Sequence, residues 1–200
     1  MNPAAAQQEA IEFLREWERR PQHVFHVAGL ALQLFDGLAG LHGLGPEERL
    51  ILEAASLLHD IGRGSKRGAT EHHLESARLI REKSWQHFAP AQVEVIAQAA
   101  RYHRKSPPQA DEEEFTRLPP EDQRRVITLG ALLRIADGLD RTHEGMVWRV
   151  RPEISPTQIV FNLSASRDAI RELEGAERKS DLARTVFQRD IVFILEPDAG

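Results

Sequence analysis

The sequence predicts a mainly α-helical fold that ends in a small extension made of a β-hairpin and a helix. Three observations support this prediction. Apolar residues recur at intervals of three and four from residue 4 to about residue 143, which is the spacing of a buried helix face. Glycine and proline interrupt this pattern at separate places and so divide it into several helices. After Gly145 the chain changes to short β-branched and aromatic runs, which are typical of strands.

The helical region is divided by breaks rich in glycine and proline. We expect the three shorter breaks at residues 40–46, 62–68 and 88–91. A longer break, SPPQADEEEFTRLPPED, runs from Ser106 to Asp122 and is rich in proline and acidic residues. We expect this segment to be a mobile, solvated loop.

The C-terminal extension contains two strand candidates, MVWRV and QIVFNL, which a PEISP turn separates. A helical stretch follows from about Ser166 to Arg189, and the run IVFIL comes after it. A chain of 200 residues is long enough for one domain with a sizeable core. We therefore expect a helical part at 1–144 and an extension at 145–200 that packs on the same domain.

The composition excludes several classes of protein. A formal net charge of -5 argues against a coat for duplex nucleic acid and against a basic membrane patch. No stretch approaches the roughly 20 apolar residues of a membrane span, and we see no secretory leader, so the expected location is cytoplasmic. Because the chain has no cysteine, a metal site would have to use the nine histidines and the carboxylates.

The stretch LLHDIGRG places His59 and Asp60 at the end of an apolar run, directly before Gly62, a natural helix C-cap. An aspartate there faces the negative end of the helix dipole and is liable to be desolvated. A bound metal would satisfy both polar side chains at once. The alternative is a capping histidine beside an exposed aspartate.

Three other metal-competent residues also lie on apolar helix faces. His23 begins the stripe that continues through Val27, and His103 extends an apolar series at helical spacing. Asp137 interrupts the apolar helix VITLGALLRIADGLDR, and Asp140 follows it by three residues. Each has a simpler interpretation, as a hydrogen-bonded core histidine or as a partner of a neighbouring arginine. Together these interpretations require several buried polar groups, each satisfied separately.

This pattern resembles the HD superfamily of metal-dependent phosphohydrolases, which is named for the central His-Asp pair. In that superfamily the first histidine, the pair and a late aspartate ligate one divalent metal, and further histidines can hold a second. The resemblance assigns the first metal to His23, His59, Asp60 and Asp137, and the second to His72 and His103.

Longer motifs resemble the helical C-terminal part of the exopolyphosphatase/guanosine pentaphosphate phosphatase (Ppx/GppA) family. They are HVAGLALQLFDGL, AASLLHDIG, HHLESARLI, ARYHRKS, LLRIADGLDR and ELEGAERKSDLARTVF. The fold that this resemblance implies is an HD-domain helical bundle. In that family, however, the exopolyphosphatase active site lies in an actin-like N-terminal half with glycine-rich phosphate loops, which this chain lacks. The family's activity therefore does not transfer with the resemblance.

Two ligand positions have close neighbours that compete for the same role. Reading the first motif as His-x-x-x-Val-Ala selects His23 over His26, which we take as a neighbour that lines the site or the core. Counting back four residues from Ser76 selects His72 over His73.

The resemblance implies one or two divalent ions per chain, which could be Mn, Fe, Ni, Zn or Mg, because ligand types alone do not decide. A metal-bound hydroxide would attack the phosphorus atom. The catalytic residues expected are Asp60, which suits a bridging position, together with His72 and His103.

A phosphorylated substrate also requires positive charge, and basic residues lie near the candidate ligands in sequence. Arginine offers bidentate contacts to phosphate, and lysine offers a point charge. Arg63 and Arg67 are weaker candidates than the rest. The expected phosphate-binding residues are Lys66, Arg101, Arg104, Lys105 and Arg141.

The sequence thus predicts a metal-dependent phosphohydrolase that acts on a small phosphorylated molecule such as a nucleotide, an alarmone or polyphosphate. One alternative is a module that binds polyphosphate or an alarmone without turnover. Another is a helical interaction protein whose extension makes a dimer contact. Because the resembled domains often pair, a homodimer stays open.

Overall fold

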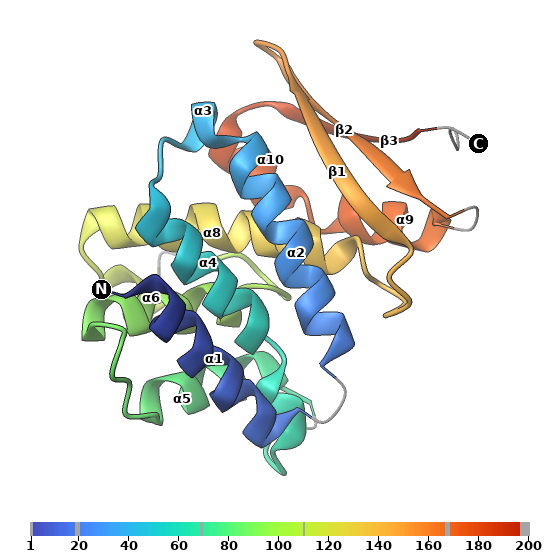
Figure 1. Cartoon of the computed structure of the whole chain (residues 1–200). Coiled ribbons are helices and arrows are strands. Elements are labelled where there is room, and N and C mark those ends of the chain that lie inside the picture. Colours follow the sequence, from blue (N-terminus) through green and yellow to red (C-terminus); the bar gives the residue numbers. More distant parts are fainter. Residues whose placement is uncertain (1, 19–20, 69, 110, 167–168, 197–200) are drawn as a thin grey trace.

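Helices occupy the chain up to Gly138, and a small sheet with two more helices follows (Figure 1). The computed structural model describes residues 2–18, 21–68, 70–109, 111–166 and 169–196. A short 3-10 helix, η1, lies between α4 and α5. The elements of this part are α1 (Pro3–Trp17), α2 (Gln22–Gly37), α3 (Ala39–His42), α4 (Pro46–Leu58), η1 (Ile61–Gly64), α5 (His72–Glu82), α6 (Pro90–Arg101), α7 (Glu113–Thr116) and α8 (Pro120–Gly138).

The C-terminal extension is a three-stranded sheet of order β1-β2-β3 with two helices before its last strand. Strands β1 and β2 form the predicted antiparallel hairpin, and β3 pairs in parallel with β2. The mainly α-helical fold with a C-terminal hairpin is therefore confirmed. The predicted helical stretch is two helices rather than one. The elements are β1 (Val147–Ile154), β2 (Gln158–Ala165), α9 (Ile170–Arg178), α10 (Asp181–Phe187) and β3 (Asp190–Leu195).

Prolines begin several of these helices. Proline suits the first helical position because its fixed φ is helical and its missing N–H has no intrahelical partner there. Pro120 begins α8, and α7 forms just before it. The prediction of a loop over residues 106–122 is therefore wrong for part of that segment, because its prolines and acidic residues start helices there.

Helix α8 is the central element of the bundle. It packs against α2, α4 and α6 and, on another side, against α9 and α10 of the extension. Its residues from Thr128 to Ala136 are all buried, so this part of the helix is enclosed on every side. Side chains on α8 are therefore placed where the helical part and the extension meet.

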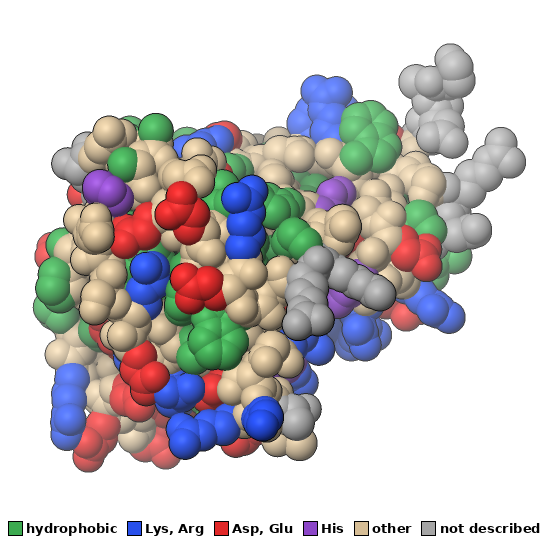
Figure 2. Space-filling view, turned by 60° about the horizontal axis from the view of Figure 1, so that its bottom comes forward, with side chains coloured by type: hydrophobic (Ala, Val, Ile, Leu, Met, Phe, Trp, Pro, Cys, Tyr) green, Lys and Arg blue, Asp and Glu red, His purple; other side chains and the backbone are tan. Residues whose placement is uncertain are grey.

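The surface carries mixed charge. Figure 2 shows acidic and basic side chains interspersed over the face drawn, without one extended basic field. In the described part of the chain, no helix combines the length and the apolar character that a membrane crossing requires.

A close backbone contact holds η1 against the start of α5. A Cβ atom on Gly62 would lie 2.2 Å from the carbonyl oxygen of His72 and 2.7 Å from the backbone nitrogen of Ser76. The backbone N–H of Gly62 donates to Ser76 Oγ at 2.9 Å. The expectation that Gly62 is a helix C-cap is wrong, since α4 ends at Leu58 and Gly62 lies within η1. Glycine is required at this position because the segment after His59 and Asp60 touches α5.

We expect Gly62→Ala to lower the free energy of unfolding by about 2–3 kcal/mol, since the added methyl group overlaps the backbone of α5. Urea denaturation measures the change. The matched control is Gly29→Ala, at an exposed position within α2 where a Cβ atom meets nothing within 4 Å. Alanine there should be neutral or stabilising by up to about 1 kcal/mol. Equal effects of the two substitutions would contradict the close contact.

Candidate metal centre

Five elements bring six metal-competent side chains into one cluster inside the bundle. His23 comes from α2, and His59 and Asp60 follow α4. Helix α5 begins with His72, His103 follows α6, and α8 supplies Asp137. Three overlapping groups of three within this set have ligand atoms that all lie within 4.8 Å of one another. The groups are His23, His59 and Asp60; His59, His103 and Asp137; and Asp60, His72 and His103.

Hydrogen bonds at Nδ1 orient three of the histidines. His23 Nδ1 lies 2.7 Å from Asp140 Oδ2, and His59 Nδ1 lies 2.7 Å from the carbonyl oxygen of Ser56. His103 Nδ1 lies 2.6 Å from the carbonyl oxygen of Ala100. Because these oxygens are acceptors, each Nδ1 carries a proton, which leaves Nε2 as the nitrogen that can ligate a metal.

Several atoms that face the centre of the cluster have no hydrogen-bond partner. Among the described residues, His23 Nε2, His59 Nε2 and Asp60 Oδ1 are buried without such a partner. Buried polar atoms are rarely left in this state, because it costs about 1–3 kcal/mol for each. These orphaned atoms are two imidazole nitrogens and a carboxylate oxygen, which are suitable ligands for a divalent transition metal. The residues present therefore fit a metal ion.

The two aspartates lie on different sides of the histidines. Asp60 Oδ1 lies 3.1 Å from His72 Nε2 and 3.6 Å from His103 Nε2. Asp137 Oδ1 lies 3.3 Å from His23 Nε2 and 3.7 Å from His59 Nε2. Ligands held about 2.1 Å from one ion lie roughly 3 Å apart, so these separations suit shared coordination.

Burial keeps His59 and His103 uncharged. It lowers the pKa of His59 to about 4, and it lowers the pKa of His103 well below its usual range. Burial by itself would raise the pKa of Asp60, but the nearby His59 and His72 rings and the charge of Arg63 lower it overall. His59 and His103 are therefore neutral imidazoles beside the ionised carboxylate of Asp60, and these are the protonation states that ligate metals.

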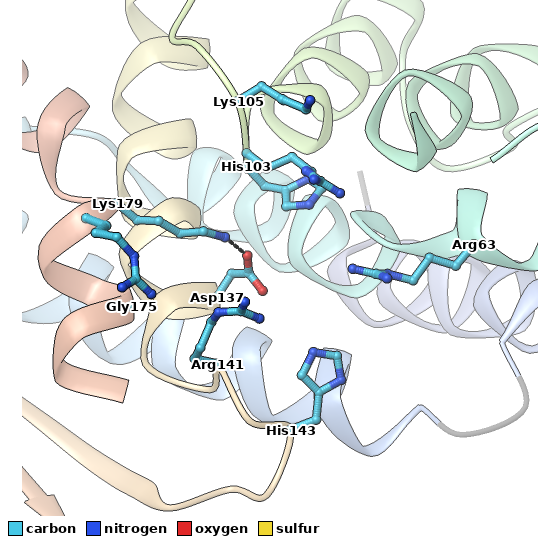
Figure 3. Close-up of a pocket in the computed structure, with 10 residues that line it drawn as sticks. Arg63, His103, Lys105, Asp137, Arg141, His143, Gly175 and Lys179 are labelled. Carbon is cyan, nitrogen blue, oxygen red and sulfur yellow. Dashed lines mark hydrogen bonds and ion pairs between the residues drawn. The ribbon is translucent and has the colours of Figure 1, made fainter. Parts of the chain in front are cut away.

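A cavity of about 570 Å³ opens beside this cluster (Figure 3). His103 and Asp137 belong to both the cavity lining and the cluster. His143 also lines the cavity, and its ring stacks on that of His23 with centroids 3.7 Å apart. Six basic side chains also line the cavity and make it positively charged. They are Arg63, Arg104, Lys105, Arg141, Arg178 and Lys179.

The predicted phosphate-binding residues divide into two groups. Arg104, Lys105 and Arg141 line the cavity. Lys66 is exposed and does not line it, and Arg101 instead forms ion pairs with Glu112 and Glu114. All of these residues lie near the candidate ligands in sequence, but proximity does not fix where a side chain points, either at Lys66 in a loop or at Arg101 at the end of α6.

The two neighbouring histidines that competed for ligand positions lie apart from the cluster. His26 Nε2 lies 2.7 Å from the carbonyl oxygen of Val147, so this ring connects α2 with β1. His73 lines a separate cavity with Arg101. Burial lowers the pKa of His73 to about 4, and the charge of Arg104 adds to the effect. The geometry thus brings His23 and His72 to the cluster.

Several contributing residues were missed by the sequence interpretation. Asp140 is buried, and its Oδ1 accepts a hydrogen bond from the backbone N–H of Gly145 at 2.9 Å while Oδ2 orients His23. Its spacing of three from Asp137 was the available signal. Lys179 forms an ion pair with Asp137 Oδ2, and burial, followed by the charge of Arg134, lowers the pKa of this lysine to about 7. No local sequence pattern predicts that a side chain at the end of α9 contacts α8.

Arg134 does not pair with Asp137, although their spacing allowed it. Its guanidinium is buried and donates to the carbonyl oxygens of Tyr102 and Lys105 at 3.0 and 2.9 Å. It also forms an ion pair with Asp181 at 2.8 Å. Arg134 thereby fixes the turn that carries His103 against α8 and α10.

The family model of the HD domain matches residues 20–142, which include all six side chains of the cluster. No curated protein matches the chain.

We expect Asp140→Asn to weaken Mn²⁺ binding about 10- to 100-fold. The two carboxylate oxygens accept from His23 and from the Gly145 N–H, and an asparagine can satisfy only one of these donors. If its amide faces His23, the ring proton moves to Nε2 and blocks ligation. Calorimetric titration of the metal-free protein measures the affinity. Asp36→Asn, at an exposed partner of Arg49, is the control, and equal affinities in both variants would contradict this role.

We expect the metal-free protein to lose stability as the pH falls from 7 to 5. The folded pKa of His59, about 4, lies below the ordinary value of 6.5, so the unfolded chain takes up the proton first. This residue alone should lower the free energy of unfolding by about 2 kcal/mol. Urea denaturation at both pH values measures the loss, which should be about 2 kcal/mol smaller in His59→Asn. The control is His87→Asn, at an exposed histidine. An unaltered loss in His59→Asn would show that this ring is not the group responsible.

Proposed function

The chain belongs to the HD domain family, within a superfamily of metal-dependent phosphohydrolases, and from this premise we propose that it hydrolyses a phosphoester or a phosphoanhydride. One observation carries the proposal: a cavity lined by six lysine and arginine side chains lies directly beside a buried cluster of histidines and aspartates. In a chain with a formal net charge of -5, such local positive charge supports a small anionic ligand.

The cluster would hold one or two divalent cations. The unpartnered Nε2 and Oδ1 atoms support this assignment, and the nitrogen-rich donor set favours Mn, Fe, Ni or Zn over Mg as sole occupant. When bound, the cation would lower the pKa of a water and polarise a phosphoryl oxygen. We assign His23, His59, Asp60 and Asp137 to the first cation and Asp60, His72 and His103 to the second.

The basic side chains of the cavity would bind and orient the substrate. Arg104 Nη1 lies 3.1 Å from both ring nitrogens of His72, which places this guanidinium between the cluster and the cavity. Arginine can contact two phosphoryl oxygens at once, so Arg104 is suited to orient the reacting phosphate. The neutral ring of His103 keeps a lone pair at Nε2, 3.6 Å from Asp60 Oδ1, where it can accept a proton when only one cation is bound.

We propose that the substrate is a nucleotide or a polyphosphate-like molecule. The number of cations around the cavity supports a ligand with more than one negative charge. We also propose a relationship to the C-terminal part of the Ppx/GppA family. The hairpin-plus-helix extension after the HD-type helices, together with the motifs shared with that family, supports this relationship.

Metal analysis combined with phosphate release tests the proposal. Protein purified without chelator or nickel affinity should contain one or two transition-metal ions per chain, measured by plasma mass spectrometry. We expect Asp60→Asn to lose metal and to lower kcat about 100-fold or more for phosphate release from nucleotides or polyphosphate. Arg104→Ala should keep its metal and raise KM roughly 10-fold or more. Arg49→Ala, at an exposed partner of Asp36, should change neither.

Metal-loaded protein that releases no phosphate from nucleotides or from polyphosphate would reject the hydrolase. In that case, binding without turnover predicts that Asp60→Asn keeps its affinity for polyphosphate, whereas Arg104→Ala loses it. Absence of metal even after dialysis against Mn²⁺ would reject the metal centre itself.

A further inference from the structure

The extension supplies one side chain that reaches the metal centre. Lys179 lies at the C-terminal end of α9, yet its ammonium forms an ion pair with Asp137 Oδ2 on α8 (Figure 3). This contact requires the two helices to approach closely. A Cβ atom on Gly138 would lie 2.7 Å from the Cα of Ala176, and one on Gly175 would lie 2.5 Å from the carbonyl oxygen of Gly138. Because both positions are glycine, the two helices pack closely enough for Lys179 to reach Asp137.

Asp137 divides its two oxygens between the cluster and the extension. Oδ1 faces the histidines, at 3.3 Å from His23 Nε2 and 3.7 Å from His59 Nε2. Oδ2 accepts from Lys179, and the ammonium also lines the cavity with its side chain 22% exposed. The Asp137 carboxylate therefore lies between Lys179 and the proposed cation site. Lys179 also lines the cavity in which a ligand would lie.

Neutralising Asp137 does not by itself account for the position of Lys179. A cation in the proposed metal centre would also neutralise Asp137, whose Oδ1 faces His23 and His59, and the rest of the cavity lining is strongly basic. A fixed ammonium among so many like charges is unfavourable unless an anion occupies the space between them. Within the described residues, Asp137 is the partner that the structure gives to the Lys179 ammonium, which has three donor positions and also lines the cavity.

We propose that Lys179 is a substrate-binding residue of the phosphohydrolase site and donates to a phosphoryl oxygen in the cavity. This inference rests on the proposed function. The extension then completes the active site of the helical part, and it contributes to substrate binding from outside the residues that the HD family model matches, 20–142.

Two lysines of equal exposure provide the test. Lys179→Met removes the cavity ammonium, and Lys83→Met is the matched control, because Lys83 is 21% exposed and pairs with Glu9 at 3.7 Å, outside the cavity lining. Binding of inorganic phosphate and of Mn²⁺ is measured separately by calorimetry on each full-length variant. We expect Lys179→Met to weaken phosphate binding about 10-fold or more and to bind Mn²⁺ as well as or better than the unaltered protein. Lys83→Met should change neither affinity.

Two results would overturn the inference. One is unchanged phosphate affinity in Lys179→Met, and the other is a joint loss of Mn²⁺ and phosphate binding, as a purely structural role predicts. If Lys179→Met does not fold, Lys179→Gln keeps a donor without the charge, and Lys179→Arg should recover part of the phosphate affinity that Lys179→Gln loses. Phosphate binding is measured without turnover, so the two proposals can fail separately. A protein that binds phosphate but hydrolyses nothing would reject the hydrolase, and the effect of Lys179→Met on phosphate affinity would still decide the role of Lys179.

Discussion

The placement of several polar side chains inside an apolar helical bundle is the constraint on which the rest of the structure depends. Each such group must be desolvated, oriented and compensated, and different elements share this task. Backbone carbonyls of Ser56 and Ala100 fix two histidine rings, and the Asp140 carboxylate fixes a third. The ring nitrogens that these contacts leave free lie close to the carboxylates, in groups that could hold a metal ion.

The segments around the cluster are held by contacts that carry no chemistry themselves. Gly62 allows η1 to touch α5, which sets His72 opposite Asp60. Arg134 holds the turn after α6 through two backbone carbonyls, which sets His103. Because these contacts are buried and directional, the geometry of the ligands follows from the packing of the bundle and not from the loops alone.

Much of this architecture follows from local sequence patterns, and the exceptions have a common physical origin. Apolar spacing predicts the helices and the inward direction of His23 and Asp137, because a helix fixes which side chains share a face. His103 also faces inward as predicted, but it lies in the turn after α6 and not on the helix. Lys179 and Asp137 lie 42 residues apart in the chain, and no local pattern encodes such a contact. The direction of a side chain in a loop could not be predicted from the sequence either, as the exposed Lys66 illustrates. The prolines near residue 120 favoured the wrong prediction of a loop, because proline interrupts a helix but also begins one, as Pro120 does in α8.

The close contact of Gly138 with Gly175 has a consequence for how such a site can change over time. A methyl group at either position would push α9 away from α8, and Arg178 and Lys179 would move with it. The charge distribution around the cavity would then change although every charged residue was retained. The charge around the cavity can thus be altered by mutation at positions without any functional group, and a comparison of the charged residues alone would show no difference between two such chains.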